Sequence, residues 1–288
     1  MSTSTILIQT LLYGLTIGVV YVLMALGFTL IFGVLRIVNF AHGEFYMLGA
    51  FLVREFFARA GLDYFASLAL AALLVGLLGV VTEMGLFRPF RETVEHQVLI
   101  ISFALSVGMQ QIGVILWGAE DMSLNAPYSG VVRWGTLIFP VDRLVAVGSC
   151  VIILAGFYLL LKHTKVGLAM EAVVQDKDAA LIQGIRVNRV YAFTFGLSTL
   201  LAAAAGGLVG PIFSLSPSMG TLPLVKAFTA VILGGMGSVT GAVVGGLFIG
   251  AAGTFLSTFF GGVAAAMLEF AVIMAILILK PSGLFGRG

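Results

Sequence analysis

Long uninterrupted runs of apolar residues constrain this chain more than any other feature of its sequence. A helix needs about 20 apolar residues to cross the ~30 Å hydrocarbon core of a bilayer. Nine segments qualify as full or short membrane helices: Ile6 to Leu35, Phe45 to Phe57, Tyr64 to Phe87, Val98 to Trp117, Leu144 to Leu161, Tyr191 to Phe213, Leu222 to Gly235, Val239 to Phe260 and Val263 to Leu279. Lipid offers no partners to backbone polar groups, so helices are expected rather than strands. The sequence therefore predicts an all-α, polytopic transmembrane bundle of about eight to nine spans, with broken or short helices.

The composition supports a membrane location for the whole chain. Of its 288 residues, 60% are hydrophobic and 10% are charged, whereas a soluble domain is roughly a quarter charged. We expect one transmembrane domain, residues 1–288. A net charge of +2 is too small to indicate a nucleic-acid partner. The only cysteine, Cys150, excludes an internal disulfide.

The distribution of lysine and arginine predicts an orientation, because cytoplasmic loops are enriched in these residues. If the polar stretch 162–190 is cytoplasmic, ten of the 15 basic residues fall on the same side of the membrane. These are Arg36, Arg88, Arg91, Lys162, Lys165, Lys177, Arg186, Arg189, Lys280 and Arg287. The other side holds Arg54, Arg59, Arg133, Arg143 and Lys226. We therefore expect the C-terminus and loop 162–190 inside, and the N-terminus outside.

The stretch 162–190 is the longest amphipathic segment of the chain. Gly167 opens it, and apolar residues then recur at helical spacing with Glu171 on another face. Asp178 is the expected cap of a second short helix, Ala179 to Gln183, which ends at Gly184. The pattern predicts two short helices held at the inner membrane surface. An ordinary loop lying on the lipid headgroups is the alternative.

Two polar or glycine-rich interruptions each lie beside a short apolar segment. The first contains Asn39, His42 and Glu44, and the second contains Gly234, Gly235, Gly237 and Ser238. Paired interruptions of this kind are typical of discontinuous transporter helices that line a translocation path or act as a hinge. A tight turn at the inner surface is the alternative, which we favour for the glycine-rich break. We expect no metal site at His42, because no histidine pair at i,i+4 and no cysteine partner accompany it.

A few charges fall within or near the predicted spans. Glu269 lies inside the last span, where it either pairs with a basic residue or is hydrated near the outer interface; we favour hydration. Glu83 and Lys226 are expected to snorkel from span ends. Pairs such as Gly14–Gly18 and Gly246–Gly250 predict close helix packing. No nucleophile–base set indicates catalysis, and no GxxxxGK[ST] motif indicates an ATPase.

Three stretches and the amphipathic loop resemble the ABC importer permeases for branched-chain amino acids. GVVYVLMALGFTLIFGVLRIVNFAHGEFYMLGAF at 18–51 is similar to their amino-terminal signature. AFTAVILGGMGSVTGAVVGG at 227–246 and KPSGLFG at 280–286 are similar to their carboxy-terminal signature and tail. In the loop, the residues that match the family's ATPase-coupling helix are Gly167, Glu171, Ala172, Asp176, Ala179, Ala180 and Gly184.

This resemblance implies the smaller of two permease subunits in a bacterial inner membrane. It implies as partners a second homologous permease, two ABC ATPase subunits and a periplasmic solute-binding protein. ATP and magnesium would then belong to the ATPase subunits, and this chain would hold no cofactor and catalyse no reaction. The implied solutes are branched-chain amino acids, with urea, short amides or other amino acids as alternatives. Two rivals outside this family are an ion-coupled secondary transporter that works alone, and an intramembrane enzyme or structural scaffold.

Overall fold

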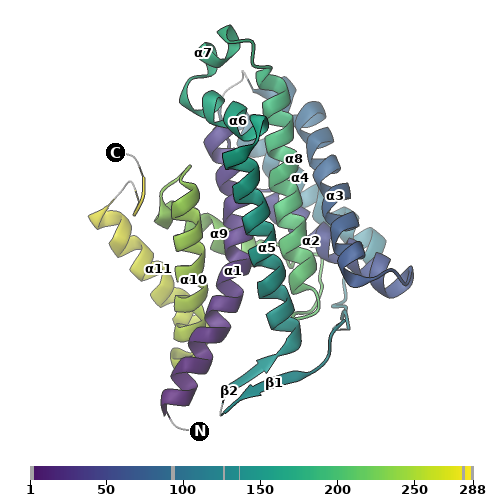
Figure 1. Ribbon diagram of the computed structural model, residues 1–288, viewed down its shortest axis with the longest axis vertical. Coiled ribbons are helices and arrows are strands. Elements are labelled where there is room, and N and C mark those ends of the chain that lie inside the picture. Colours follow the sequence, from purple (N-terminus) through teal and green to yellow (C-terminus); the bar gives the residue numbers. More distant parts are fainter. Residues whose placement is uncertain (1–2, 92–94, 126, 136, 281–282, 287–288) are drawn as a thin grey trace.

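The computed structural model describes residues 3–91, 95–125, 127–135, 137–280 and 283–286 (Figure 1). Arg287 of the predicted inner charge set, and Pro281 and Ser282 of the tail motif, lie outside the described residues. The elements in chain order are α1 (Thr3–Leu35), α2 (His42–Arg54) with a π-helical turn (Glu55–Arg59), α3 (Tyr64–Thr82) with a second π-helical turn (Glu83–Phe87) and a 3-10 turn (Arg88–Phe90), α4 (Glu95–Trp117), β1 (Val131–Trp134), β2 (Leu137–Pro140), α5 (Val141–His163), α6 (Lys165–Gln175), α7 (Lys177–Ile182), α8 (Val187–Val209), α9 (Thr221–Gly234), α10 (Val239–Phe260) and α11 (Gly262–Leu279).

The described chain is an all-α bundle of membrane helices, as predicted. All nine apolar segments form helices, and within the described residues six of these are long and apolar enough to span a bilayer: α1, α3, α4, α5, α8 and α10. The prediction of eight to nine spans is therefore not confirmed. The helices α2 and α9 have 13 and 14 residues. At 1.5 Å per residue each is about 20 Å long, which is too short for the hydrocarbon core.

The long helix α1 lies at the centre of the bundle, between α8 and α10 (Figure 1). Most of its apolar window is buried, unlike those of α4 and α5, which are mainly exposed to the surroundings. Small residues allow the closest approach: a Cβ on Gly14 would lie 2.8 Å from the Cα of Ala251 in α10. This packing confirms the prediction from the GxxxG pairs.

A small β-hairpin lies at the end of the bundle that carries the N-terminus (Figure 1). Its strands β1 and β2 are antiparallel, with Val131 opposite Pro140 and Trp134 opposite Leu137. The side chain of Gln9 in α1 accepts a hydrogen bond from Ile138 N at 3.0 Å and donates one to Ile138 O at 2.6 Å. These strands were not predicted, because each has only four residues; β1 is exposed and β2 is mostly half-buried. The hairpin defines one end of the bundle; α6 and α7 define the opposite end.

Candidate functional site

The helices α6 and α7 form a compact helical hairpin at the end of the bundle opposite the N-terminus (Figure 1). The Thr164 hydroxyl caps α6, accepting a hydrogen bond from Gly167 N at 3.1 Å. Gly167 lies directly against the backbone of Leu161 near the end of α5. A side chain at 167 would therefore prevent α6 from folding back so closely on α5. The prediction of two short helices in this loop is confirmed by α6 and α7.

The second short helix begins at a different residue from the one predicted. Asp176 Oδ1 accepts hydrogen bonds from Asp178 N at 2.9 Å and Ala179 N at 3.0 Å, so Asp176 rather than Asp178 is the cap. Asp176 has the extended backbone that a cap requires, while Asp178 already lies in the first turn of α7. The helix therefore spans Lys177–Ile182 instead of Ala179 to Gln183. Gly184 follows it with φ +81°.

The seven predicted coupling residues divide into a buried and an exposed group. Gly167 and Ala180 are buried against the bundle, and Ala172 is half-buried. The exposed residues are Glu171, Asp176, Ala179 and Gly184. Large apolar side chains are exposed beside them: Ile182 is 86% exposed and Leu168 is 67% exposed. The helical spacing of apolar residues did not identify Ile182 as exposed, because burial depends on where the hairpin meets the bundle.

A cavity of about 300 Å³ separates this hairpin from the end of α1. Its walls are the last residues of α1 with Arg36, the junction of α6 and α7, and Tyr191 of α8. Arg36 has φ +57°, which no other described non-glycine residue shares in the positive range. This conformation ends α1 and turns the chain toward the first predicted break.

The first break places the start of α2 deep within the bundle. His42 Nε2 lies 3.2 Å from Met24 O of α1, and the ring also faces Gly27. Gly27 O in turn accepts a hydrogen bond from Ser198, the twelfth of 23 residues in α8. The N-terminus of α2 is therefore at the mid-depth of a spanning helix, and not at a membrane surface. This location supports the discontinuous-helix interpretation of the break.

The N-termini of both short helices meet at this depth. Gly220, the residue that precedes α9, contacts Gly43 in the first turn of α2. A Cβ on Gly43 would lie 2.6 Å from Gly220 O. The two short helices thus run from a common central point toward opposite ends of the bundle, as discontinuous transporter helices do.

Helix α4 lines one side of the α2 N-terminus with hydroxyl groups. Ser102 Oγ accepts a hydrogen bond from Phe40 N at 3.3 Å, and Ser106 Oγ donates one to Glu44 Oε1 at 3.1 Å. Asn39 Oδ1 accepts from Ala41 N at 3.0 Å. We call Asn39, Glu44, Ser102 and Ser106 the α2–α4 polar seam. The sequence analysis missed the two serines, because only the fold shows that they face α2.

The second break is a turn that packs against the C-terminal tail. Gly235 has φ +102° and contacts the backbone of Gly286, and Gly237 lies beside Gly33 of α1. The tail pairs with the end of α9 through hydrogen bonds from Leu284 N to Leu233 O and from Phe285 N to Gly234 O. Ser238 caps α10. These contacts match the tight-turn interpretation, and they separate this break from the first one.

Two of the predicted solitary charges are paired. Glu269 of α11 is buried and forms an ion pair with Lys226 of α9, so the expectation that Glu269 is hydrated was wrong. Glu83 is fully buried and pairs with Arg91, so it does not snorkel. Both partners are far away in sequence or beyond a helix end, and hydropathy alone does not identify them. A buried carboxylate in an apolar bundle requires such a partner.

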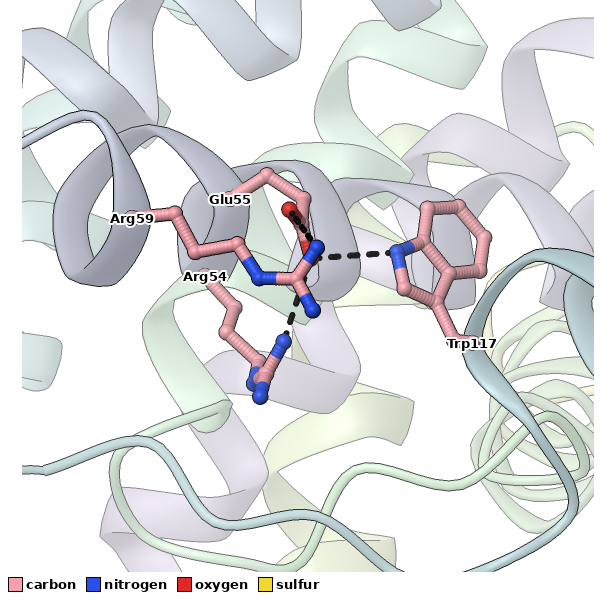
Figure 2. A network of polar contacts seen from close by, with 4 residues as sticks. All are labelled: Arg54, Glu55, Arg59 and Trp117. Atoms are coloured by element: carbon pink, nitrogen blue, oxygen red, sulfur yellow. Dashed lines mark hydrogen bonds and ion pairs between the residues drawn. The ribbon is translucent and has the colours of Figure 1, made fainter.

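At the end of the bundle that carries the β-hairpin, Glu55 organises a polar network after the end of α2 (Figure 2). Its carboxylate accepts hydrogen bonds from Arg54 Nη1 at 3.1 Å, Arg59 Nη1 at 2.9 Å and Trp117 Nε1 at 3.2 Å. The indole of Trp117 also stacks on Phe51, with the ring centroids 4.5 Å apart. The network fixes the C-terminal end of α2 to the C-terminal end of α4, and it was not predicted from the sequence.

Six spanning helices, two short helices that meet inside the bundle and a helical hairpin projecting from one end define a multi-pass membrane permease. The family model described as the permease component of the branched-chain amino acid transport system matches residues 10–279. The chain belongs to this family.

Curated relatives cover nearly the whole chain. The high-affinity branched-chain amino acid transport system permease protein BraD of Pseudomonas aeruginosa is 30% identical, over 97% of this chain and 96% of its own length. Its counterpart LivH of Escherichia coli is also 30% identical with the same coverage. A probable branched-chain amino acid transport permease protein LivH of Methanocaldococcus jannaschii is 28% identical over 92% of this chain.

Proposed function

We propose that this chain translocates branched-chain amino acids as one permease subunit of an ATP-driven importer in a bacterial inner membrane. The observation that carries this proposal is the family match over residues 10–279, together with relatives of that named function across 97% of the chain. Residues 1–288 act as a single transmembrane domain. A second homologous permease, two ABC ATPases and a periplasmic solute-binding protein complete the transporter.

The hairpin of α6 and α7 is the proposed contact with an ATPase subunit. It projects from the bundle and exposes Ile182, Leu168 and Leu181 beside the charged Glu171. Exposed apolar side chains outside the spanning part of a membrane protein indicate a protein partner. Since Gly167 packs on α5 and α8 follows α7 after four residues, a movement of this hairpin is transmitted to two spans.

The proposed ATPase contact implies a side of the membrane for each end of the bundle. The α6–α7 end and the C-terminal tail are cytoplasmic, and the N-terminus with the β-hairpin is periplasmic. ATP and magnesium bind in the ATPase subunits, and no cofactor belongs to this chain. Asn39, His42 and Glu44 line the translocation path, while the tight turn of Gly234, Gly235, Gly237 and Ser238 acts as a hinge at the cytoplasmic end of the bundle.

Reconstitution tests the proposal directly. The tagged chain, purified in mild detergent, is expected to bring with it two P-loop ATPases and a second permease. In proteoliposomes, leucine uptake should require enclosed ATP and external binding protein. Uptake that survives ATP depletion and responds to an ion gradient would contradict the proposal in favour of a secondary transporter. Preferential uptake of urea or an amide would contradict only the solute class.

Two matched substitutions test the docking surface. Ile182→Asp places a charge on an exposed apolar residue of α7, and Trp134→Asp does the same at the opposite end, where Trp134 is also largely exposed. Only the Ile182 variant is expected to lose the co-purified ATPases. Equal retention of the ATPases by both variants would rule out α7 as a major contact.

A further inference from the structure

Three carboxylates lie within the helical core of the described chain, and they differ in how their charge is balanced. Glu83 is paired with Arg91 and Glu269 with Lys226. Glu44 is equally buried, with 3% of its surface exposed, but no lysine, arginine or histidine of the described residues forms an ion pair with it. An ionised carboxylate at membrane depth is costly unless a positive charge neutralises it.

The hydrogen bonds of Glu44 leave half of its carboxylate available. Ser106 Oγ binds Oε1, whereas Oε2 has no hydrogen-bond partner among the described residues. Ser102 lies one helical turn from Ser106, and it is directed at Phe40 N rather than at the carboxylate. The geometry thus holds Glu44 by one oxygen and leaves the other free to accept a bond.

A donor on the same seam is also unused. Asn39 is 1% exposed, and its Oδ1 is bound by Ala41 N, which fixes the side chain at the N-terminus of α2. Its Nδ2 has no partner among the residues that the structure describes. Buried polar groups are nearly always hydrogen-bonded, so an unused donor and an unused acceptor at one helix start require an explanation.

We propose that the α2–α4 polar seam binds the charged end of the solute during its passage. Glu44 Oε2 accepts a hydrogen bond from the α-ammonium group, and the Asn39 amide donates to the α-carboxylate. The positive end of the α2 dipole adds to the attraction for that carboxylate. The solute therefore brings the counter-charge that Glu44 lacks, whereas Glu83 and Glu269 carry permanent ones. This inference rests on the proposed function, because it requires an amino acid as solute.

The seam selects for the amino and carboxyl groups, not for the side chain. It is expected to favour any zwitterionic α-amino acid over a neutral amide such as urea. Discrimination among leucine, isoleucine and valine then belongs to another component. In the arrangement described here the contact of Gly43 with Gly220 closes this depth, so binding requires the two short helices to separate.

Substitution of Glu44 in the complete reconstituted transporter tests this inference. The measured quantity is the transport ratio, the number of leucine molecules transported per ATP hydrolysed. Glu44→Gln is expected to lower this ratio about ten-fold, because it removes one charge-assisted hydrogen bond. ATP hydrolysis stimulated by the loaded binding protein should stay within about two-fold of wild type, because the ATPases and outer surface are untouched. Glu44→Asp should recover much of the ratio, and Ser106→Ala should lower it by a smaller factor.

The control is Thr29→Val, which alters a buried polar group of α1 that has no assigned role. Its transport ratio should equal that of wild type. A second readout uses radiolabelled leucine bound to the complex without binding protein. Isoamylamine, which is leucine without its carboxylate and so keeps the ammonium group, should compete with leucine in wild type and not in Glu44→Gln.

Two results would overturn the inference. One is a wild-type transport ratio in Glu44→Gln; the other is an equal loss in Glu44→Gln and Glu44→Asp with no effect of isoamylamine, which would indicate packing rather than charge. In either case ATP-dependent leucine uptake by the wild-type complex still supports the proposed function. If wild type itself shows no such uptake, the proposed function fails first.

Discussion

Single residues in this bundle explain why charges persist among apolar helices. Lys226 and Glu269 connect α9 to α11 as an ion pair beside Gly253 of α10. Removal of one partner leaves the other buried and unpaired, which in proteins costs about 3–5 kcal/mol. Helix α11 packs mainly against α10 and contacts α9 much less, so this pair is an important link between α11 and α9.

Lys226→Met and Glu269→Gln are therefore each expected to destabilise the protein by about 3 kcal/mol, and the double variant by clearly less. Thermal unfolding in nanodiscs measures the difference. Additive losses in the double variant would show that the two side chains act independently. The charge-reversed pair Lys226→Glu with Glu269→Lys serves as a control for the bond itself.

The backbone of Arg36 makes a second prediction at the residue scale. A left-handed conformation costs a non-glycine residue roughly 1–2 kcal/mol, and glycine is free of this cost. Arg36→Gly is thus expected to be about 1 kcal/mol more stable than Arg36→Ala, because both lose the same charge and only alanine keeps the strain. Equal stabilities in chemical denaturation would contradict this account.

At the scale of the element, the cap of α7 separates two neighbouring aspartates. Asp176→Ala removes the acceptor for two backbone N–H groups and should cost about 1 kcal/mol of local helix stability. Asp178→Ala removes the same charge from the first turn and should have a much smaller effect. Hydrogen exchange of the α7 amides measures both. Faster exchange in the Asp178 variant than in the Asp176 variant would contradict the structure.

The elements also show what a sequence can predict for such a protein. Apolar runs located the nine apolar helices, since each lies in lipid or in the apolar interior of the bundle. The depth at which α2 and α9 begin depends on contacts such as Gly43 with Gly220, which no local pattern contains. The same reason applies to the partners of Glu83 and Glu269. Asp176 and Asp178 both satisfy a capping pattern, and only the backbone conformation decides between them.

Among the site residues, the amphipathic period identified the α6–α7 hairpin, but not its exposed Ile182. The polar break identified Asn39, His42 and Glu44. Ser102 and Ser106 belong to the same polar seam and were not predicted, because serine in an apolar helix commonly bonds to its own backbone. Only the packing of α4 on α2 gives Ser106 a different role.

For the whole molecule, the proposed orientation places the α6–α7 hairpin inside and the β-hairpin outside. Cys150 is the only cysteine of the sequence, so Cys150→Ala gives a cysteine-free background in which each introduced cysteine is labelled alone. A membrane-impermeant maleimide should label Arg133→Cys in intact cells, and Lys177→Cys only after the inner surface is opened. Labelling of Lys177→Cys from outside would reverse the orientation and remove the proposed ATPase contact.

The contact between Gly43 and Gly220 has a consequence for the energetics of the cell. A transporter in an energised membrane must not conduct protons or ions while it is idle, and in the proposed path the contact between these two glycine backbones is the block at mid-depth. A side chain at either position, as in Gly43→Val, is expected to keep the starts of α2 and α9 apart and so to leave the path partly open. Vesicles that contain the variant should then dissipate an imposed proton gradient faster than wild-type vesicles, with no solute and no nucleotide present.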